Sequence, residues 1–197
     1  VVAGSMGPTG EIMEPVGPLS MADATQAFHE QAAALAEGGA DVLWIETISS
    51  TEEYEAAVKG AAATGLPVVG TMTFDTNGRT MMGVTPEDAA SFASSLSPGV
   101  HGYGCNCGVG PATLIDTVLG LRKTAADTDI IVAKGNCGIP EYVDGEIAYS
   151  GSPEIMATYA KLARRAGARI IGGCCGTTAI HLKAIKEALD GYDPEPA

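Results

Sequence analysis

Short apolar segments alternate with longer amphipathic segments along the chain at a spacing of about 30 residues, as in repeated βα units. The short segments are continuous runs of apolar or small residues, which is typical of parallel strands covered on both faces. The pattern predicts an α/β fold built on a parallel sheet. Six strands are predicted, at residues 1–3, 42–45, 67–72, 102–105, 130–133 and 169–172.

Capping residues mark the helices between these strands. A Ser or Thr can accept a hydrogen bond from the first turn of a helix, and such residues stand at Ser20, Ser50, Thr85 and Ser152. A glycine favours the left-handed conformation that ends a helix, and candidates stand at Gly38, Gly65 and Gly167. The predicted helices span residues 21–36, 52–63, 88–95, 155–166 and 178–189.

Six βα units fit two architectures. A closed (β/α)8 barrel needs eight strands and about 250 residues, whereas an open doubly wound sheet can stop at six. Because the chain opens inside a strand at Val1 and Val2, we predict a (β/α)8 barrel of which this chain covers about six carboxy-terminal units. Residues 1–190 would form that domain, with about two amino-terminal units absent, and residues 191–197 a polar tail. A complete six-stranded α/β domain is the alternative.

Composition and charge limit the classes of partner that the protein is expected to bind. The chain has 197 residues, of which 46% are hydrophobic, enough for one sizeable core. With 24 acidic residues against 11 basic ones, the net charge of -13 opposes a phosphate-binding surface. We therefore expect neither nucleic acid nor a membrane as a partner, while a homo-oligomer stays open. Five cysteines that cluster at strand ends fit a reducing compartment, so a cytoplasmic protein is expected.

The arrangement of the cysteines suggests a catalytic metal site. Cys174 and Cys175 follow a hydrophobic strand within the glycine-rich residues 172–176, and adjacent cysteines make a poor structural disulfide. The glycines allow a turn that can bring both sulfurs to one target. Residues 103–108, which include Cys105 and Cys107, offer a third sulfur. Three thiolates are a favoured ligand set for zinc, and an open fourth position distinguishes a catalytic zinc from a structural one.

These residues resemble a known family. The sequences GSMGP at residues 4–8, IET at 45–47, GCNC at 104–107 and GGCCGTT at 172–178 resemble successive signatures of the zinc-dependent homocysteine S-methyltransferases. That family includes betaine-homocysteine methyltransferases and the homocysteine-binding module of cobalamin-dependent methionine synthase. The resemblance implies a (β/α)8 barrel in which Cys107, Cys174 and Cys175 bind zinc and the sulfur of homocysteine fills the open site.

The implied activity is zinc-dependent transfer of a methyl group to the homocysteine thiolate, forming methionine, with betaine or a related methylated onium compound as donor. Zinc suits this task because a free thiol has a pKa of about 8.5 and coordination deprotonates it. One alternative is a non-catalytic fragment or module of a cobalamin-dependent methionine synthase that binds zinc and homocysteine. Another is an inert metal site closed by a fourth protein ligand.

Two further residues are candidates for substrate binding. A carboxylate that closes an apolar strand needs a partner, and the resemblance implies that Glu46 binds the ammonium group of homocysteine. Capping of the next helix is the alternative for Glu46. Thr9 lies where related enzymes place a hydroxyl near the substrate carboxylate. The remaining candidates are interpreted as buried side chains without a role in the site: Cys105, Cys137 and Trp44.

Overall fold

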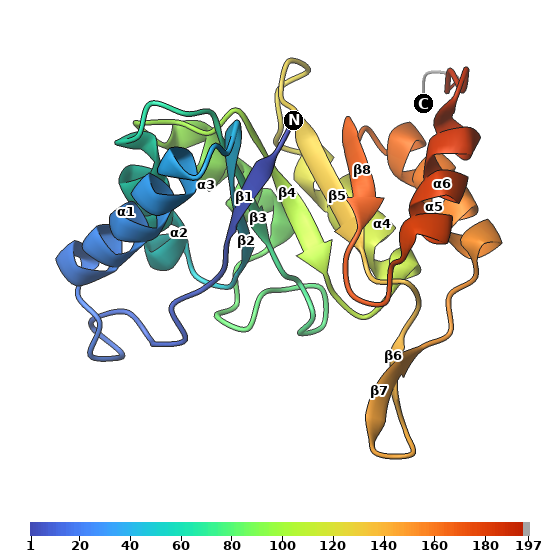
Figure 1. Cartoon of the computed structure of the whole chain (residues 1–197), viewed down its shortest axis with the longest axis horizontal. Helices are drawn as coiled ribbons and strands as arrows, with labels where there is room; N and C mark the ends of the chain where they lie inside the picture. The colour runs from blue at the N-terminus through green and yellow to red at the C-terminus, as the bar shows by residue number, and fades with distance from the viewer. Residues whose placement is uncertain (195–197) are drawn as a thin grey trace.

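The computed structural model describes residues 1–194, and the predicted tail lies partly outside this range, at residues 195–197 (Figure 1). The strands are β1 (Ala3–Met6), β2 (Val42–Ile48), β3 (Val68–Met72), β4 (Gly102–Cys107), β5 (Ile131–Gly135), β6 (Pro140–Val143), β7 (Glu146–Tyr149) and β8 (Ile170–Gly173). The helices are α1 (Met21–Glu37), α2 (Thr51–Ala62), α3 (Pro86–Ser95), α4 (Pro111–Arg122), α5 (Pro153–Arg165) and α6 (Ala179–Leu189). Within these residues no helix has both the length and the apolar character that a membrane crossing requires.

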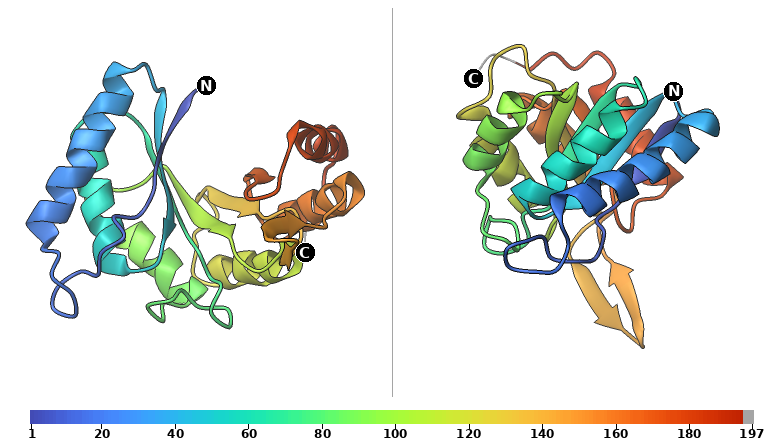
Figure 2. Two further views of the ribbon diagram at one scale, coloured as in Figure 1. Left: turned by 60° about the horizontal axis from the view of Figure 1, so that its bottom comes forward. Right: turned by 90° about the vertical axis from the view of Figure 1, so that its left-hand side faces the viewer.

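The main sheet is parallel and curled. Its strands follow the order β1-β2-β3-β4-β5-β8. Each strand therefore pairs with the next strand along the chain, except that β6 and β7 are left out of this sheet. The helices cover its outer face and leave an inner, concave face (Figure 2). A doubly wound sheet reverses strand order at a switch point and carries helices on both faces. The doubly wound alternative is therefore wrong, and the fold is a partial barrel.

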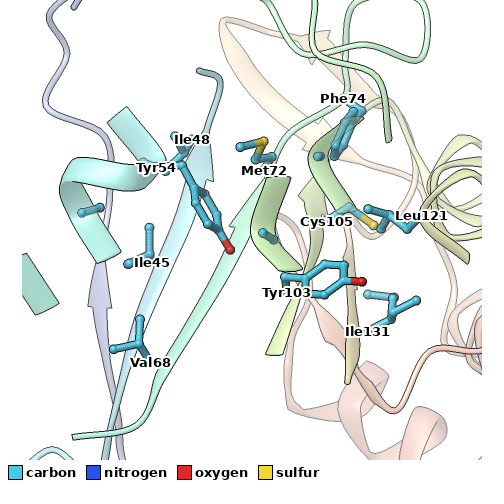
Figure 3. Close-up of a cluster of buried hydrophobic side chains, with 14 of the residues drawn as sticks. Ile45, Ile48, Tyr54, Val68, Met72, Phe74, Tyr103, Cys105, Leu121 and Ile131 are labelled. Carbon is cyan, nitrogen blue, oxygen red and sulfur yellow. The ribbon is translucent and has the colours of Figure 1, made fainter. Parts of the chain in front are cut away.

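The core lies between the sheet and the helices. In β2, Leu43, Ile45 and Ile48 are fully buried on the outer face, and Tyr54 of α2 packs among such side chains (Figure 3). Since side chains alternate along a strand, the residues between them point to the concave face. Trp44, expected in the core, is therefore only partly buried and lines the concave face.

The predicted helix caps are confirmed, although α3 and α5 begin two residues earlier than predicted. Each predicted cap accepts a hydrogen bond from the backbone N–H three residues later, at Ser20, Ser50, Thr85 and Ser152. Helix α4 was not among the predicted helices, because it begins after Gly110, which has no side chain to cap it. Gly65 and Gly167 adopt the predicted left-handed conformation, with φ of 79° and 104°. Gly38 does not, since its φ is -70° and Gly39 takes the left-handed position instead.

Apart from β3, which ends at Met72 as predicted, the strands of the main sheet end later than predicted. β1 begins at Ala3, where its predicted strand ended, and β2, β4 and β5 each run two or three residues further. Polar residues in these extensions broke the apolar pattern on which the prediction depended. Their side chains lie on the concave face, where a polar group does not enter the core. Glu46, Asn106 and Lys134 therefore lie inside strands.

Strands β6 and β7 form a two-stranded antiparallel hairpin that projects from the partial barrel (Figure 1). Asp144 and Gly145 form its turn, with φ of 51° and 91°. An Asp-Gly pair with positive φ at both residues is typical of a type I′ hairpin turn. The hairpin was not predicted, because its strands are short and exposed and carry no continuous apolar run.

Candidate metal centre and substrate site

Three cysteine sulfurs converge at the carboxyl ends of β4 and β8. The Sγ atoms of Cys107, Cys174 and Cys175 all lie within 4.8 Å of one another. The Cys107 sulfur is 3.0 Å from that of Cys174 and 3.8 Å from that of Cys175. The two adjacent cysteines have their sulfurs 4.0 Å apart. The predicted set of three cysteines is thus brought together, and all five cysteines of the chain are free thiols.

Backbone conformation produces this convergence. Cys107 ends β4 with a φ of 58°, a left-handed conformation that is uncommon outside glycine and turns its side chain away from the strand alternation. A Cβ atom at Gly173 would lie 2.3 Å from Thr177, and one at Gly176 would lie 2.4 Å from the Tyr149 ring. Glycine is therefore required at both positions that flank the adjacent cysteines, as the sequence indicated.

Asn136 joins the two cysteine loops. Its Oδ1 accepts a hydrogen bond of 3.0 Å from the backbone N–H of Cys175. Its Nδ2 donates at 2.8 Å to the carbonyl of Gly108, next to Cys107. Asn136 is buried, with 4% of its surface exposed. Sequence reasoning missed this role, although a polar residue directly after a buried strand was a signal that could have found it.

Asn106 organises the concave face beside the sulfurs. Its Oδ1 accepts hydrogen bonds from the Thr71 hydroxyl at 2.7 Å and from the Thr47 backbone N–H at 2.9 Å. Its Nδ2 donates to the Thr47 hydroxyl at 2.8 Å and lies 3.9 Å from the Cys174 sulfur. Asn106 is fully buried. It therefore connects the end of β2, where Thr47 has a φ of 68°, to the cysteine cluster.

The contact between Cys107 and Cys174 shifts the pKa values of these two thiols in opposite directions. The hydrogen bond from Cys107 lowers the pKa of Cys174 to about 5. The same hydrogen bond, followed by burial, raises the pKa of Cys107 above its ordinary value. The two sulfurs are 3.0 Å apart and either can be the donor, so the pair favours one shared proton over two thiolates. Cys105 differs, because burial alone raises its pKa and its Sγ lies 3.7 Å from the Val132 carbonyl in the core (Figure 3).

The Cys137 thiol also lies outside the cluster, although the Cys137 backbone N–H donates to the Cys175 carbonyl at 2.9 Å. The side chain of Cys137 is buried, and its Sγ donates a hydrogen bond of 2.9 Å to the carbonyl of Gly151. The structure thus places both Cys105 and Cys137 as buried thiols, in agreement with the interpretation of the sequence.

Glu46 points into the concave face from β2. Its Oε1 accepts a hydrogen bond of 2.6 Å from the Ser5 hydroxyl, and its Oε2 is paired with Lys134 Nζ of β5. Burial acts to raise the pKa of Glu46, but the hydrogen bonds from Lys134 and Ser5 outweigh it, and the pKa falls below its ordinary value. Glu46 is therefore a carboxylate at neutral pH. Sequence reasoning missed Lys134, a lysine directly after a predicted buried strand.

Thr9 lies against a different carboxylate. Its backbone N–H and its hydroxyl both donate to Glu53 Oε1, at 2.8 Å and 2.6 Å. Glu53 stands in the first turn of α2 and is 5% exposed. The loop after β1, which holds Thr9, also lines a cavity of about 360 Å³ together with Thr47 and the methionines Met81 and Met82.

Three thiols lie together at the carboxyl edge of a parallel, curled sheet, and this group could hold a metal ion on a barrel-like α/β scaffold. The family model for homocysteine S-methyltransferase matches residues 1–189. The chain belongs to the homocysteine S-methyltransferase family.

Individual relatives agree with this assignment. The chain is 30% identical over 195 residues to methionine synthase of Mycobacterium tuberculosis, covering 95% of this chain and 16% of that protein. The apo form of the homocysteine methyltransferase MmuM from Escherichia coli superimposes with a TM-score of 0.74 at 28% identity, covering 95% of this chain and 62% of that one. The oxidized form of MmuM gives a TM-score of 0.64 at 25% identity, with coverages of 83% and 52%. The chain thus spans less than two thirds of these relatives.

Proposed function

We propose that this protein transfers a methyl group to the thiolate of homocysteine, forming methionine, with zinc bound by Cys107, Cys174 and Cys175. The observation that carries the proposal is the convergence of these three sulfurs within 4.8 Å in a chain of the homocysteine S-methyltransferase family. We also infer that the partial barrel belongs to a (β/α)8 architecture, since it covers 62% of the MmuM chain that it superimposes on.

The donor set fits zinc. A Zn–S bond of about 2.3 Å places two sulfurs of a tetrahedron about 3.8 Å apart. Two sulfur pairs already have this spacing, at 3.8 Å and 4.0 Å. The pair Cys107 and Cys174, at 3.0 Å, would open when the shared proton leaves and the ion enters. The thiolate character of Cys174 also suits a soft cation.

Each residue then has a task. Zinc, when bound, supplies the Lewis acidity that keeps the homocysteine thiol deprotonated. Glu46 would hold the substrate ammonium by a charged hydrogen bond. The thiolate sulfur attacks the methyl carbon, and the bond between that carbon and the donor breaks with its electrons left on the donor. Thr9 would have to leave Glu53 before its hydroxyl could reach the substrate carboxylate.

We infer a methylated onium compound, such as betaine, as the donor. The cavity of about 360 Å³ at the strand ends is lined by carboxylates and by methionines, which favours a cationic, partly apolar molecule. The alternative is a homocysteine-binding module of a cobalamin-dependent methionine synthase. This alternative is supported by the match of 95% of the chain to 16% of a methionine synthase.

A donor screen tests the function. We expect the zinc-loaded protein to form methionine from homocysteine and one donor among betaine, S-methylmethionine and methylcobalamin, measured by mass spectrometry. Turnover with an onium donor alone would support the first proposal, whereas turnover with methylcobalamin alone would support the module. A zinc-loaded protein that binds homocysteine but methylates it with none of these donors would contradict the catalytic proposal.

Homocysteine binding should release about one proton near pH 7. The thiol is mostly protonated in solution and must become a thiolate to bind the metal. Titration calorimetry in buffers of different ionisation enthalpy measures this number. Methionine, which lacks the thiol, is the control ligand and should release no proton. Equal heats of homocysteine binding in all buffers would contradict the proposed activation.

A further inference from the structure

The concave face carries an ion pair, Glu46 and Lys134, of which the proposed function uses only Glu46. Glu46 and Lys134 are the only charged residues in the six strands of the main sheet. They come from β2 and β5, which are separated by two other strands. In a flat sheet these strands would lie about 14 Å apart, so the two side chains meet because the sheet curls. The charges are held on the inner face, where 22% of the Lys134 side chain and 20% of the Glu46 side chain are exposed.

The partners of Lys134 leave part of its ammonium group free. Lysine has three N–H donors, and Glu46 is its only hydrogen-bond acceptor within residues 1–194. The ammonium also lies 5.2 Å from the centre of the Trp44 ring, a cation–π contact that adds no nitrogen or oxygen acceptor for its N–H groups. A partly buried cation with unused donors can accept a further anion at low cost, because much of its water has already been removed.

Lys134 also lies close to the metal centre. In the sheet it is paired with Asn106 on one side and with Gly172 on the other. Asn106 Nδ2 is 3.9 Å from the Cys174 sulfur, and Gly172 stands two residues before that cysteine. Homocysteine has only two methylene groups between its sulfur and its α-carbon. A substrate whose sulfur joins the cysteine cluster therefore has its charged end near this part of the face.

We propose that Lys134 binds the α-carboxylate of the substrate while Glu46 binds its ammonium group, so that the Glu46–Lys134 pair selects α-amino acid thiols. This inference rests on the proposed function. An α-amino acid has its ammonium group and its carboxylate attached to the same carbon. When it lies over the ion pair, its ammonium group is beside Glu46 and its carboxylate is beside Lys134. Thr9 is less suited to the carboxylate, since its two donors are occupied by Glu53.

Three ligands separate the two charges. Homocysteine has both, 4-mercaptobutanoate lacks the ammonium group, and 3-aminopropanethiol lacks the carboxylate. Affinity is measured by titration calorimetry of the zinc-loaded chain, and by the fluorescence of Trp44. Because Trp44 is the single tryptophan of the chain, its emission reports directly on the environment of Lys134.

In Lys134→Met, the affinity for homocysteine and for 4-mercaptobutanoate should fall about tenfold to a hundredfold, the value of one charged hydrogen bond. The affinity for 3-aminopropanethiol should stay unchanged or rise, because Glu46 loses its competing cation. Glu46→Gln should show the opposite pattern, with losses for the two amines only. Lys161→Met is the matched control: Lys161 lies 5.6 Å from the Tyr192 ring on another part of the surface, and its loss should change no affinity.

The outcomes distinguish this inference from the proposed function. If the parent chain binds homocysteine and Lys134→Met weakens all three ligands equally, or none, the carboxylate role is overturned and the proposed function stands. If the zinc-loaded parent chain binds no homocysteine, both are overturned. If Lys134→Met fails to fold, Lys134→Gln replaces it in the same affinity measurements, with the same expected results.

Discussion

The double variant Cys174→Ala, Cys175→Ala will retain no zinc and will methylate no homocysteine. It removes two of the three sulfurs that lie within 4.8 Å of one another, and a single remaining thiolate cannot hold the ion against water. Zinc content should fall from about one per chain to background, because ligand count and charge set the affinity of such sites. Metal analysis after gel filtration measures the content, and a methionine assay measures the activity.

Cys137→Ala is the matched control for the double variant. Its thiol is buried and donates to the Gly151 carbonyl, so it resembles the ligands in chemistry without facing the cluster. This variant should keep its zinc. Full zinc in the double variant would show that the metal, if any, is bound elsewhere.

Asn106→Leu should lower the free energy of unfolding by about 3 kcal/mol. The substitution keeps the branched outline of the side chain but leaves the Thr47 N–H and the Thr71 hydroxyl without their acceptor. Each buried polar group that loses its partner costs about 1 to 3 kcal/mol. Denaturant unfolding of the metal-free protein measures the loss without a contribution from zinc.

Gln26→Leu provides the comparison for Asn106→Leu. Gln26 is an exposed amide on α1, and its replacement should change the free energy of unfolding by less than about 0.5 kcal/mol. A loss below about 1 kcal/mol in Asn106→Leu would mean that water replaces the amide, and that the hydrogen bonds of Asn106 contribute little to the conformation of Thr47.

Local chemistry was enough to predict much of the fold. Side-chain caps fixed the starts of four helices, and the glycines around Cys174 indicated that three sulfurs could converge. Helix α4 was not predicted, because Gly110 has no side chain that could cap it. The ends of β2 and β5 were predicted too early. A polar residue that faces the concave side cannot be told, from the sequence, from a residue that follows a buried strand.

The partner of Glu46 could not be predicted from local patterns. Lys134 is 88 residues away in the sequence and belongs to a strand that is not adjacent to β2. Only the curvature of the sheet brings the two side chains together, and curvature depends on packing of all the helices. Thr9 shows the same limit, since its contact with Glu53 depends on how the loop after β1 folds back onto α2.

The position of β8 gives the metal site a mechanical consequence. Within the described residues β8 is paired only with β5. A metal ion bound to Cys107 and Cys174 would tie β8 to β4 across 67 residues. By the chain-entropy relation for a cross-link of that length, the restraint is worth about 4 kcal/mol. Zinc depletion would then abolish methyl transfer and would also remove a restraint on β8, α5 and α6. These elements would become more accessible to proteases.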